Sequence, residues 1–173
     1  WFIYSGVPYK KNVIIRTFIS LFVLPAMLVF GVSLSLLVPS PLVIIGTVFM
    51  AVVAAVTYVS HSMQLGSVLR SKNPVDPTVI GSGGEGSLLI YGPISHLLFA
   101  LSLIFWAVGL LNADFIPVWI AVVGYITAII QLTLVPTIFS KTNPAQFYSL
   151  NGWNIPVSGG LYMMWLLIVS IYF

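Results

Sequence analysis

The sequence predicts an all-α, polytopic membrane protein, a bundle of about five transmembrane helices that forms one domain over residues 1–173. Composition is the first reason, because 60% of the residues are hydrophobic and only 5% are charged. A soluble domain carries roughly 25% charged residues. The second reason is that the apolar residues gather in runs of about 20, the length that crosses the hydrocarbon layer of a bilayer. The third is that the basic residues lie between these runs on alternate connections, as the positive-inside rule predicts.

Proline, glycine and polar residues separate the apolar runs. Ser40 and Pro41 follow the first run, and these residue types suit the N-cap and the first position of the next helix. The segment 70–87 is the main predicted loop, because its prolines and glycines favour turns over helix. The last run is at the short end of the usable length. The predicted spans are about 17–38, 42–69, 88–111, 118–139 and 157–173.

The charged residues predict how the chain crosses the membrane. Five spans place all 6 Lys and Arg residues on one face, whereas Asp114 is the only charged residue on the other. Basic loops stay in the cytoplasm during membrane insertion. We therefore expect a cell-membrane protein with its N-terminus inside and its C-terminus outside. The basic residues are Lys10, Lys11 and Arg16 before the first span, Arg70 and Lys72 after the second, and Lys141 after the fourth.

Several functions lack the residues that they need. The chain has no cysteine, which excludes disulfides, thiolate metal sites and thiol catalysis. The glycine-rich segment 81–86 lacks the Lys-Ser/Thr ending of a phosphate-binding P-loop. No Asp, Glu, Lys or Arg lies deep within a predicted span, which argues against a proton-coupled carrier. We expect no catalytic residue, no metal site and no nucleic-acid partner.

Two histidines are the main candidates for a cofactor site. His61 precedes the end of its predicted span by eight residues, and His96 follows the start of its own by eight, which is roughly 12 Å of depth for each. Because the two helices are antiparallel neighbours, the rings should lie at the same level, as the ligands of a b-type haem or the walls of a quinone site do. Met63 could add a soft ligand for copper. Alternatively, the histidines are interior side chains bonded to hydroxyls and carbonyls, or His61 lies among the lipid headgroups.

Gln131 is the polar residue near the middle of the fourth span. A buried amide in a membrane usually bonds a neighbouring helix, and it could also line a path for a solute. Small residues spaced four apart predict where helices approach closely. These pairs are Gly31 with Ser35, Ala51 with Ala55, and Gly124 with Ala128.

Three functions remain open. The default is a non-catalytic integral subunit of a larger membrane complex of the respiratory or transport type, with lipid and other membrane subunits as its partners. The second is a small b-type cytochrome or a quinone-handling electron-transfer protein that uses His61 and His96, with haem b as the possible cofactor. The third is a small carrier or channel for a neutral or apolar solute, with Gln131 on the transport path. A visible absorption spectrum separates the cytochrome from the other two.

Overall fold

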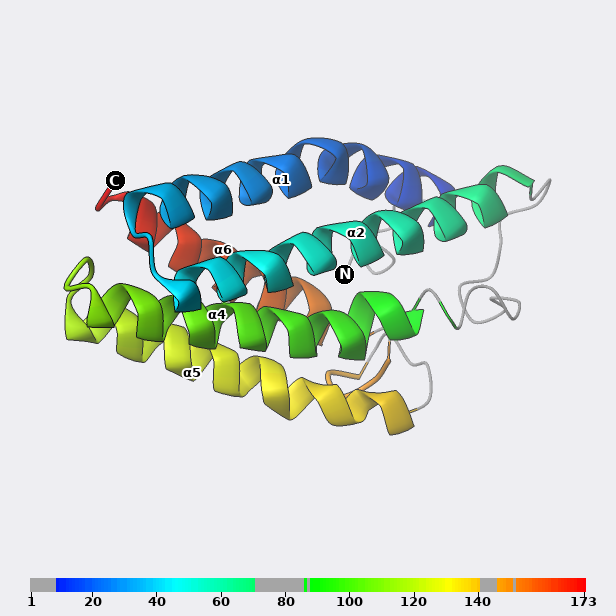
Figure 1. The fold of residues 1–173 in the computed structure, drawn as a ribbon. Helices are drawn as coiled ribbons and strands as arrows, with labels where there is room; N and C mark the ends of the chain where they lie inside the picture. The colour runs from blue at the N-terminus through cyan, green and yellow to red at the C-terminus, as the bar shows by residue number, and fades with distance from the viewer. Residues whose placement is uncertain (1–8, 71–85, 87, 141–145, 151) are drawn as a thin grey trace.

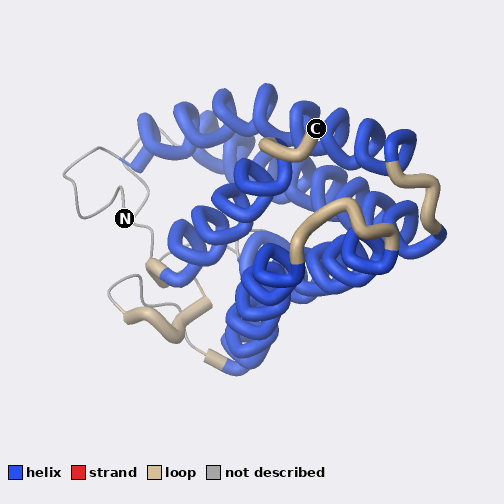
Figure 2. The backbone as a smooth tube through the Cα atoms, turned by 90° about the vertical axis from the view of Figure 1, so that its left-hand side faces the viewer, coloured by secondary structure: helices blue, strands red, loops and turns tan. Residues whose placement is uncertain are grey.

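The apolar runs of the sequence form helices, and prolines or polar turns separate them. The computed structural model describes residues 9–70, 86, 88–140, 146–150 and 152–173, and no strand is present among these residues (Figures 1 and 2). The elements are α1 (Tyr9–Leu37), α2 (Pro41–Arg70), the π-helix η1 (Ile90–Ile94), α4 (Ser95–Asn112), α5 (Val118–Leu134), the 3₁₀-helix η2 (Val135–Phe139) and α6 (Asn154–Ser170). The prediction of an all-α fold is confirmed.

The helices have the length and composition of membrane spans. Within the described ranges, 4 spans are long and apolar enough to cross a bilayer: Val13–Leu37, Pro41–Gly66, Ile90–Asn112 and Val118–Phe139. The fifth predicted span corresponds to α6, a shorter apolar helix of 17 residues. The chain is therefore a multi-pass membrane protein. The first helix differs from the prediction, because it begins at Tyr9, before the apolar run.

The helices pack in chain order, α1 on α2, α2 on α4, α4 on α5, and α5 on α6. They run up and down, so the bundle has two distinct ends (Figure 1). We call one the turn end, where residues 38–40 and 113–117 join neighbouring helices, and the other the loop end, where α1 begins and α2 ends. The C-terminus lies at the turn end, and α2 projects beyond the start of α4 at the loop end (Figure 1).

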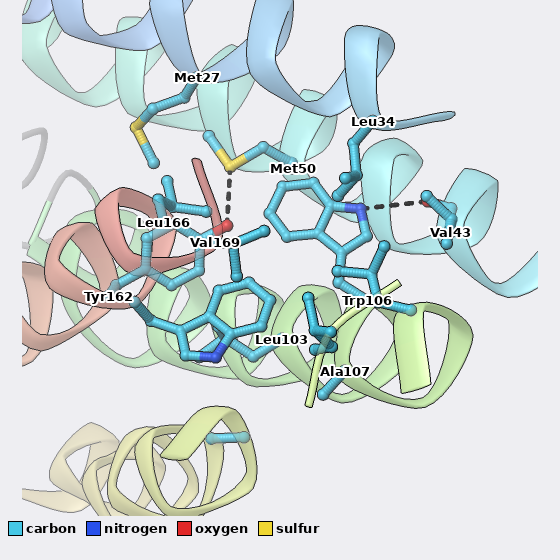
Figure 3. Packing of buried hydrophobic residues seen from close by; sticks show 14 of the residues in the cluster. Met27, Leu34, Val43, Met50, Leu103, Trp106, Ala107, Tyr162, Leu166 and Val169 are labelled. Atoms are coloured by element: carbon cyan, nitrogen blue, oxygen red, sulfur yellow. Dashed lines mark hydrogen bonds between the residues drawn. The ribbon is translucent and has the colours of Figure 1, made fainter. Parts of the chain in front are cut away.

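Two buried tryptophans form the core near the turn end. The rings of Trp106 and Trp165 stack with their centroids 6.4 Å apart, and neither side chain is exposed. The indole nitrogen of Trp106 donates to the carbonyl oxygen of Val43 at 3.1 Å (Figure 3). That of Trp165 donates to the carbonyl oxygen of Ile120 at 3.0 Å. Each indole therefore ties its own helix to the backbone of another.

Glycines make room for these rings. A Cβ atom at Gly46 would lie 2.5 Å from Trp106, and one at Gly124 would lie 2.8 Å from Trp165. Two of the predicted small-residue pairs, Gly31 with Ser35 and Gly124 with Ala128, lie at such helix contacts. The third prediction is wrong, because Ala51 and Ala55 are exposed on the outer face of α2. Alanine is tolerated on a lipid-facing surface as well as in a helix contact, so its spacing alone does not identify the packed face.

Candidate functional site

A cavity of about 180 Å³ lies inside the bundle toward the loop end, and residues of α1, α2, η1, α4 and α6 line it. Most of its wall is apolar, and Leu24, Met27 and Phe99 contribute to it. The polar residues in the wall include His61, Tyr91, Ser95, His96, Ser158 and Tyr162. This combination of an apolar wall with a few polar groups is typical of sites for small organic molecules.

A π-helical turn precedes the histidine of α4. Pro93 has no N–H to donate, and its ring would clash with the carbonyl four residues earlier in a regular α-helix. The chain widens instead, so that both the backbone N–H and the hydroxyl of Ser95 donate to the carbonyl oxygen of Ile90, five residues back. The turn is buried at Gly92 and Pro93. It places Tyr91 and Ser95 in the cavity wall together with His96, and π-turns of this kind are frequent at functional sites.

His96 is held by groups from two other helices. Its Nδ1 lies 2.6 Å from Oε1 of Gln131 on α5 and 3.4 Å from the hydroxyl oxygen of Ser158 on α6. The amide nitrogen of Gln131 donates to the carbonyl oxygen of Ser158 at 3.0 Å. The Nε2 atom of His96 is buried and has no hydrogen-bond partner in the described part of the chain. One edge of this imidazole is therefore fixed by the protein, and the other is unpaired.

His61 is buried, and its side chain is 2% exposed. Neither ring nitrogen has a hydrogen-bond partner among the residues that the structure describes. The ring packs against Tyr91, with the two centroids 5.1 Å apart. An unpaired buried polar group costs about 1–3 kcal/mol, so native structures keep few of them without a functional reason.

The structure brings His61 and His96 into the wall of the same cavity. His61 contacts the ring of Tyr91, which precedes His96 by five residues. The two imidazoles are not hydrogen bonded to each other, because both nitrogens of His61 lack a partner. The equal depth of the two rings stays a prediction. Since the side chain of His61 is 2% exposed, it packs inside the bundle and not against lipid headgroups.

The cavity does not match a haem. Its volume of about 180 Å³ is close to the roughly 150 Å³ of a protein cavity that binds benzene, and a porphyrin is several times larger than benzene. Met63 is 39% exposed and lies on another face of α2 from His61. In the part of the chain that the structure describes, no three residues among His, Cys, Asp and Glu form a group that could hold a metal.

Gln131 lies behind His96, fully buried between α5 and α6, and it is not among the residues that line the cavity. The sequence predicts a contact with a neighbouring helix, and the hydrogen bond to the Ser158 carbonyl is that contact. The link to His96 was not predicted, because span positions do not show which way a helix is rotated.

Arg16 is a second residue whose role the sequence did not show. The sequence predicts Arg16 as a charge outside the first span, but its side chain points inward from α1 and donates to the side-chain oxygen of Gln64 on α2. Its guanidinium lies over the ring of Tyr91, 4.9 Å from the centroid. The amide of Gln64 in turn donates to Ser60 at 3.2 Å. The available signal was the spacing of Ser60 and Gln64, four apart on an otherwise apolar helix.

Comparison of the chain with protein-family models, with curated proteins and with solved structures finds no match.

Proposed function

We propose that this membrane protein binds a small, lipid-soluble ring compound of the quinone class in the cavity beside His61 and His96. The observation that carries the proposal is that three imidazole nitrogens, two of His61 and one of His96, are buried beside one cavity without a partner among the described residues. A ligand oxygen in the cavity would supply the missing hydrogen bonds. The rest of the wall is apolar and suits the ring itself.

The size of the cavity limits the ligand to one substituted ring. A cavity of roughly 150 Å³ holds benzene, and this one measures about 180 Å³. Any longer apolar tail must leave the cavity. The wall residues Ser20 and Val23 of α1 and Gly159 and Met163 of α6 are partly exposed, so the cavity is not closed off on that side. A ligand dissolved in the bilayer could enter there, between α1 and α6.

The other two functions have weaker support. A subunit of a larger complex remains a prediction, because the exposed apolar side chains of α1, such as Phe18, Phe22 and Leu36, would suit lipid as well as a partner helix. For a solute carrier, Gln131 would have to face the path, and its amide is instead used by His96 and Ser158.

The proposal is tested by binding to the purified protein in nanodiscs. The probe is a para-benzoquinone with a short alkyl tail, in its oxidised and reduced forms, measured by quenching of tryptophan fluorescence and by calorimetry. We expect saturable binding of at least one form with one site per chain. His61→Leu and His96→Leu should each weaken it about tenfold, which corresponds to about 1.4 kcal/mol and to one lost hydrogen bond.

Thr127→Val is the matched control. Thr127 is buried on α5, donates only to the carbonyl of Val123 within its own helix at 2.9 Å, and does not line the cavity. It should leave the affinity unchanged. Absence of saturable binding, or equal binding by the histidine variants and the wild type, would overturn the proposal.

A further inference from the structure

We infer that Gln131 is a positioning residue that holds His96 as a hydrogen-bond acceptor toward the cavity, so that the cavity selects a ligand that donates an O–H group. For a quinone-class ligand, this means the hydroquinone rather than the quinone. The choice of ligand rests on the proposed function, whereas the state of His96 follows from the hydrogen bonds around it.

The backbone of α6 fixes the orientation of the Gln131 amide. The backbone carbonyl oxygen of Ser158 can only accept, so the Gln131 atom that faces it at 3.0 Å must be the nitrogen. The amide oxygen then faces His96 Nδ1 at 2.6 Å. Rotating the amide by half a turn would set two carbonyl oxygens against each other. The backbone of α6 therefore determines which Gln131 atom His96 meets.

The Gln131 amide in turn determines which ring nitrogen of His96 carries the hydrogen. Because Gln131 Oε1 can only accept, the Nδ1 atom must carry the hydrogen. The Ser158 hydroxyl agrees with this, since it donates to the carbonyl of Ile155 at 3.1 Å and so offers His96 a lone pair at 3.4 Å. A buried imidazole without a carboxylate partner is neutral, because an unpaired buried charge is costly. A neutral ring has one N–H, so Nε2 carries a lone pair.

The lone pair on Nε2 lacks a donor. Among the residues that the structure describes, the Nε2 atom is buried with no hydrogen-bond partner. A buried lone pair without a donor indicates that the missing group is a donor. A ligand hydroxyl supplies one, whereas a quinone carbonyl would add a second acceptor.

His61 does not impose the same restriction. Neither of its nitrogens is hydrogen bonded to a residue that the structure describes, so its ring can present either an N–H or a lone pair to a ligand. The selectivity for a donor therefore comes from His96 and depends on Gln131. A binding site whose buried polar group is placed to pair with one group of the ligand binds analogues that lack this group much more weakly.

The state of His96 can be measured without any ligand. Nitrogen-15 NMR shifts distinguish the two neutral tautomers and the cation, and the chain has only 2 histidines, so His61→Leu assigns the signals. We expect the Nδ1–H tautomer for His96 in the wild type and a mixture in Gln131→Met, which keeps the length of the side chain but not its amide. A hydrogen on Nε2, alone or together with Nδ1, would overturn the inference.

The selectivity is measured with the short-tailed benzoquinone and its hydroquinone. The wild type should bind the hydroquinone about tenfold more tightly than the quinone, and Gln131→Met should reduce that ratio to about one. Gln146→Met, an exposed glutamine in the loop before α6, is the matched control and should keep the ratio. Equal affinities in a wild type that shows the Nδ1–H signal would overturn the selectivity. Loss of binding to both forms would instead overturn the proposed function and leave the NMR result as it is.

Discussion

The two halves of the bundle differ in whether their buried polar groups have hydrogen-bond partners. In the half at the turn end, both buried indole nitrogens donate to carbonyls of other helices. In the half at the loop end, several buried polar atoms lack a partner. Within the described residues, these atoms belong to Arg16, Thr17, His61, His96 and Asn154.

We therefore expect the half at the turn end to contribute most of the stability and the half at the loop end to bind the ligand. Packing and satisfied hydrogen bonds hold the turn half together, as they do in most membrane bundles. The loop half keeps unpaired groups around a cavity, and such groups reduce the stability of the folded state unless a ligand pairs with them. Substitutions in the two halves should therefore change the stability of the protein in different directions.

Trp106→Ala should have the largest effect. It removes a fully buried ring that contacts Trp165 and bonds Val43, and large-to-small changes of this kind cost about 3–5 kcal/mol. The free energy of unfolding is measured by steric trapping in bicelles. Trp119→Ala, at a tryptophan that is 55% exposed, is the control and should change it by less than about 0.5 kcal/mol. Similar losses for both variants would mean that Trp106 is not central to the packing.

Gly46→Ala should destabilise the same half by overpacking. The new Cβ would lie 2.5 Å from Trp106 Cδ1, and the buried ring cannot move away without disturbing its neighbours, so a loss of about 1–3 kcal/mol is expected. Gly160→Ala is the control, because a Cβ there has nothing within 4 Å. Since alanine is the better helix former, the control should gain about 0.5–1 kcal/mol. An unchanged or raised stability of Gly46→Ala would contradict the close contact.

His61→Leu should raise the stability of the ligand-free protein, whereas Trp106→Ala should lower it. Leucine fills similar space and removes two unpaired nitrogens, so the protein without ligand should become more stable by about 1 kcal/mol. The same variant should lose the binding described above. The measurement is the unfolding midpoint with and without the hydroquinone. A clear loss of stability without ligand would show that His61 has a partner in the folded protein.

Cysteine labelling tests which end of the bundle faces the cytoplasm, with little effect on stability. The chain has no cysteine of its own, so Ala113→Cys at the turn end and Gln146→Cys at the loop end each provide a single exposed thiol. The distribution of Lys and Arg predicts that an impermeant reagent added outside the cell labels position 113 and not position 146. The reverse pattern would show that the predicted orientation is wrong.

The spans could be predicted because a bilayer imposes a length. A helix that crosses the hydrocarbon needs about 20 apolar residues, and charges accumulate at its ends. The predicted end of α2 at residue 69 agrees with the observed Arg70, and the predicted end of the third span at 111 agrees with Asn112. The assignment of Arg16 to the region outside the first span failed, because a long side chain at a helix end can turn inward to a polar group on the next helix.

Composition and the spacing of the apolar runs are enough to predict a multi-pass helical membrane protein, and His61, His96 and Gln131 stand out as polar residues within its spans. Which of these residues meet depends on how the helices pack. The hydrogen bond from His96 to Gln131 joins residues 35 apart in the sequence, and it depends on how α4 and α5 are rotated about their axes. In a soluble protein, the polar face of a helix shows its rotation, because water and core select different residues. Lipid is as apolar as the core of this bundle, so the sequence of each helix carries little record of the face that it buries.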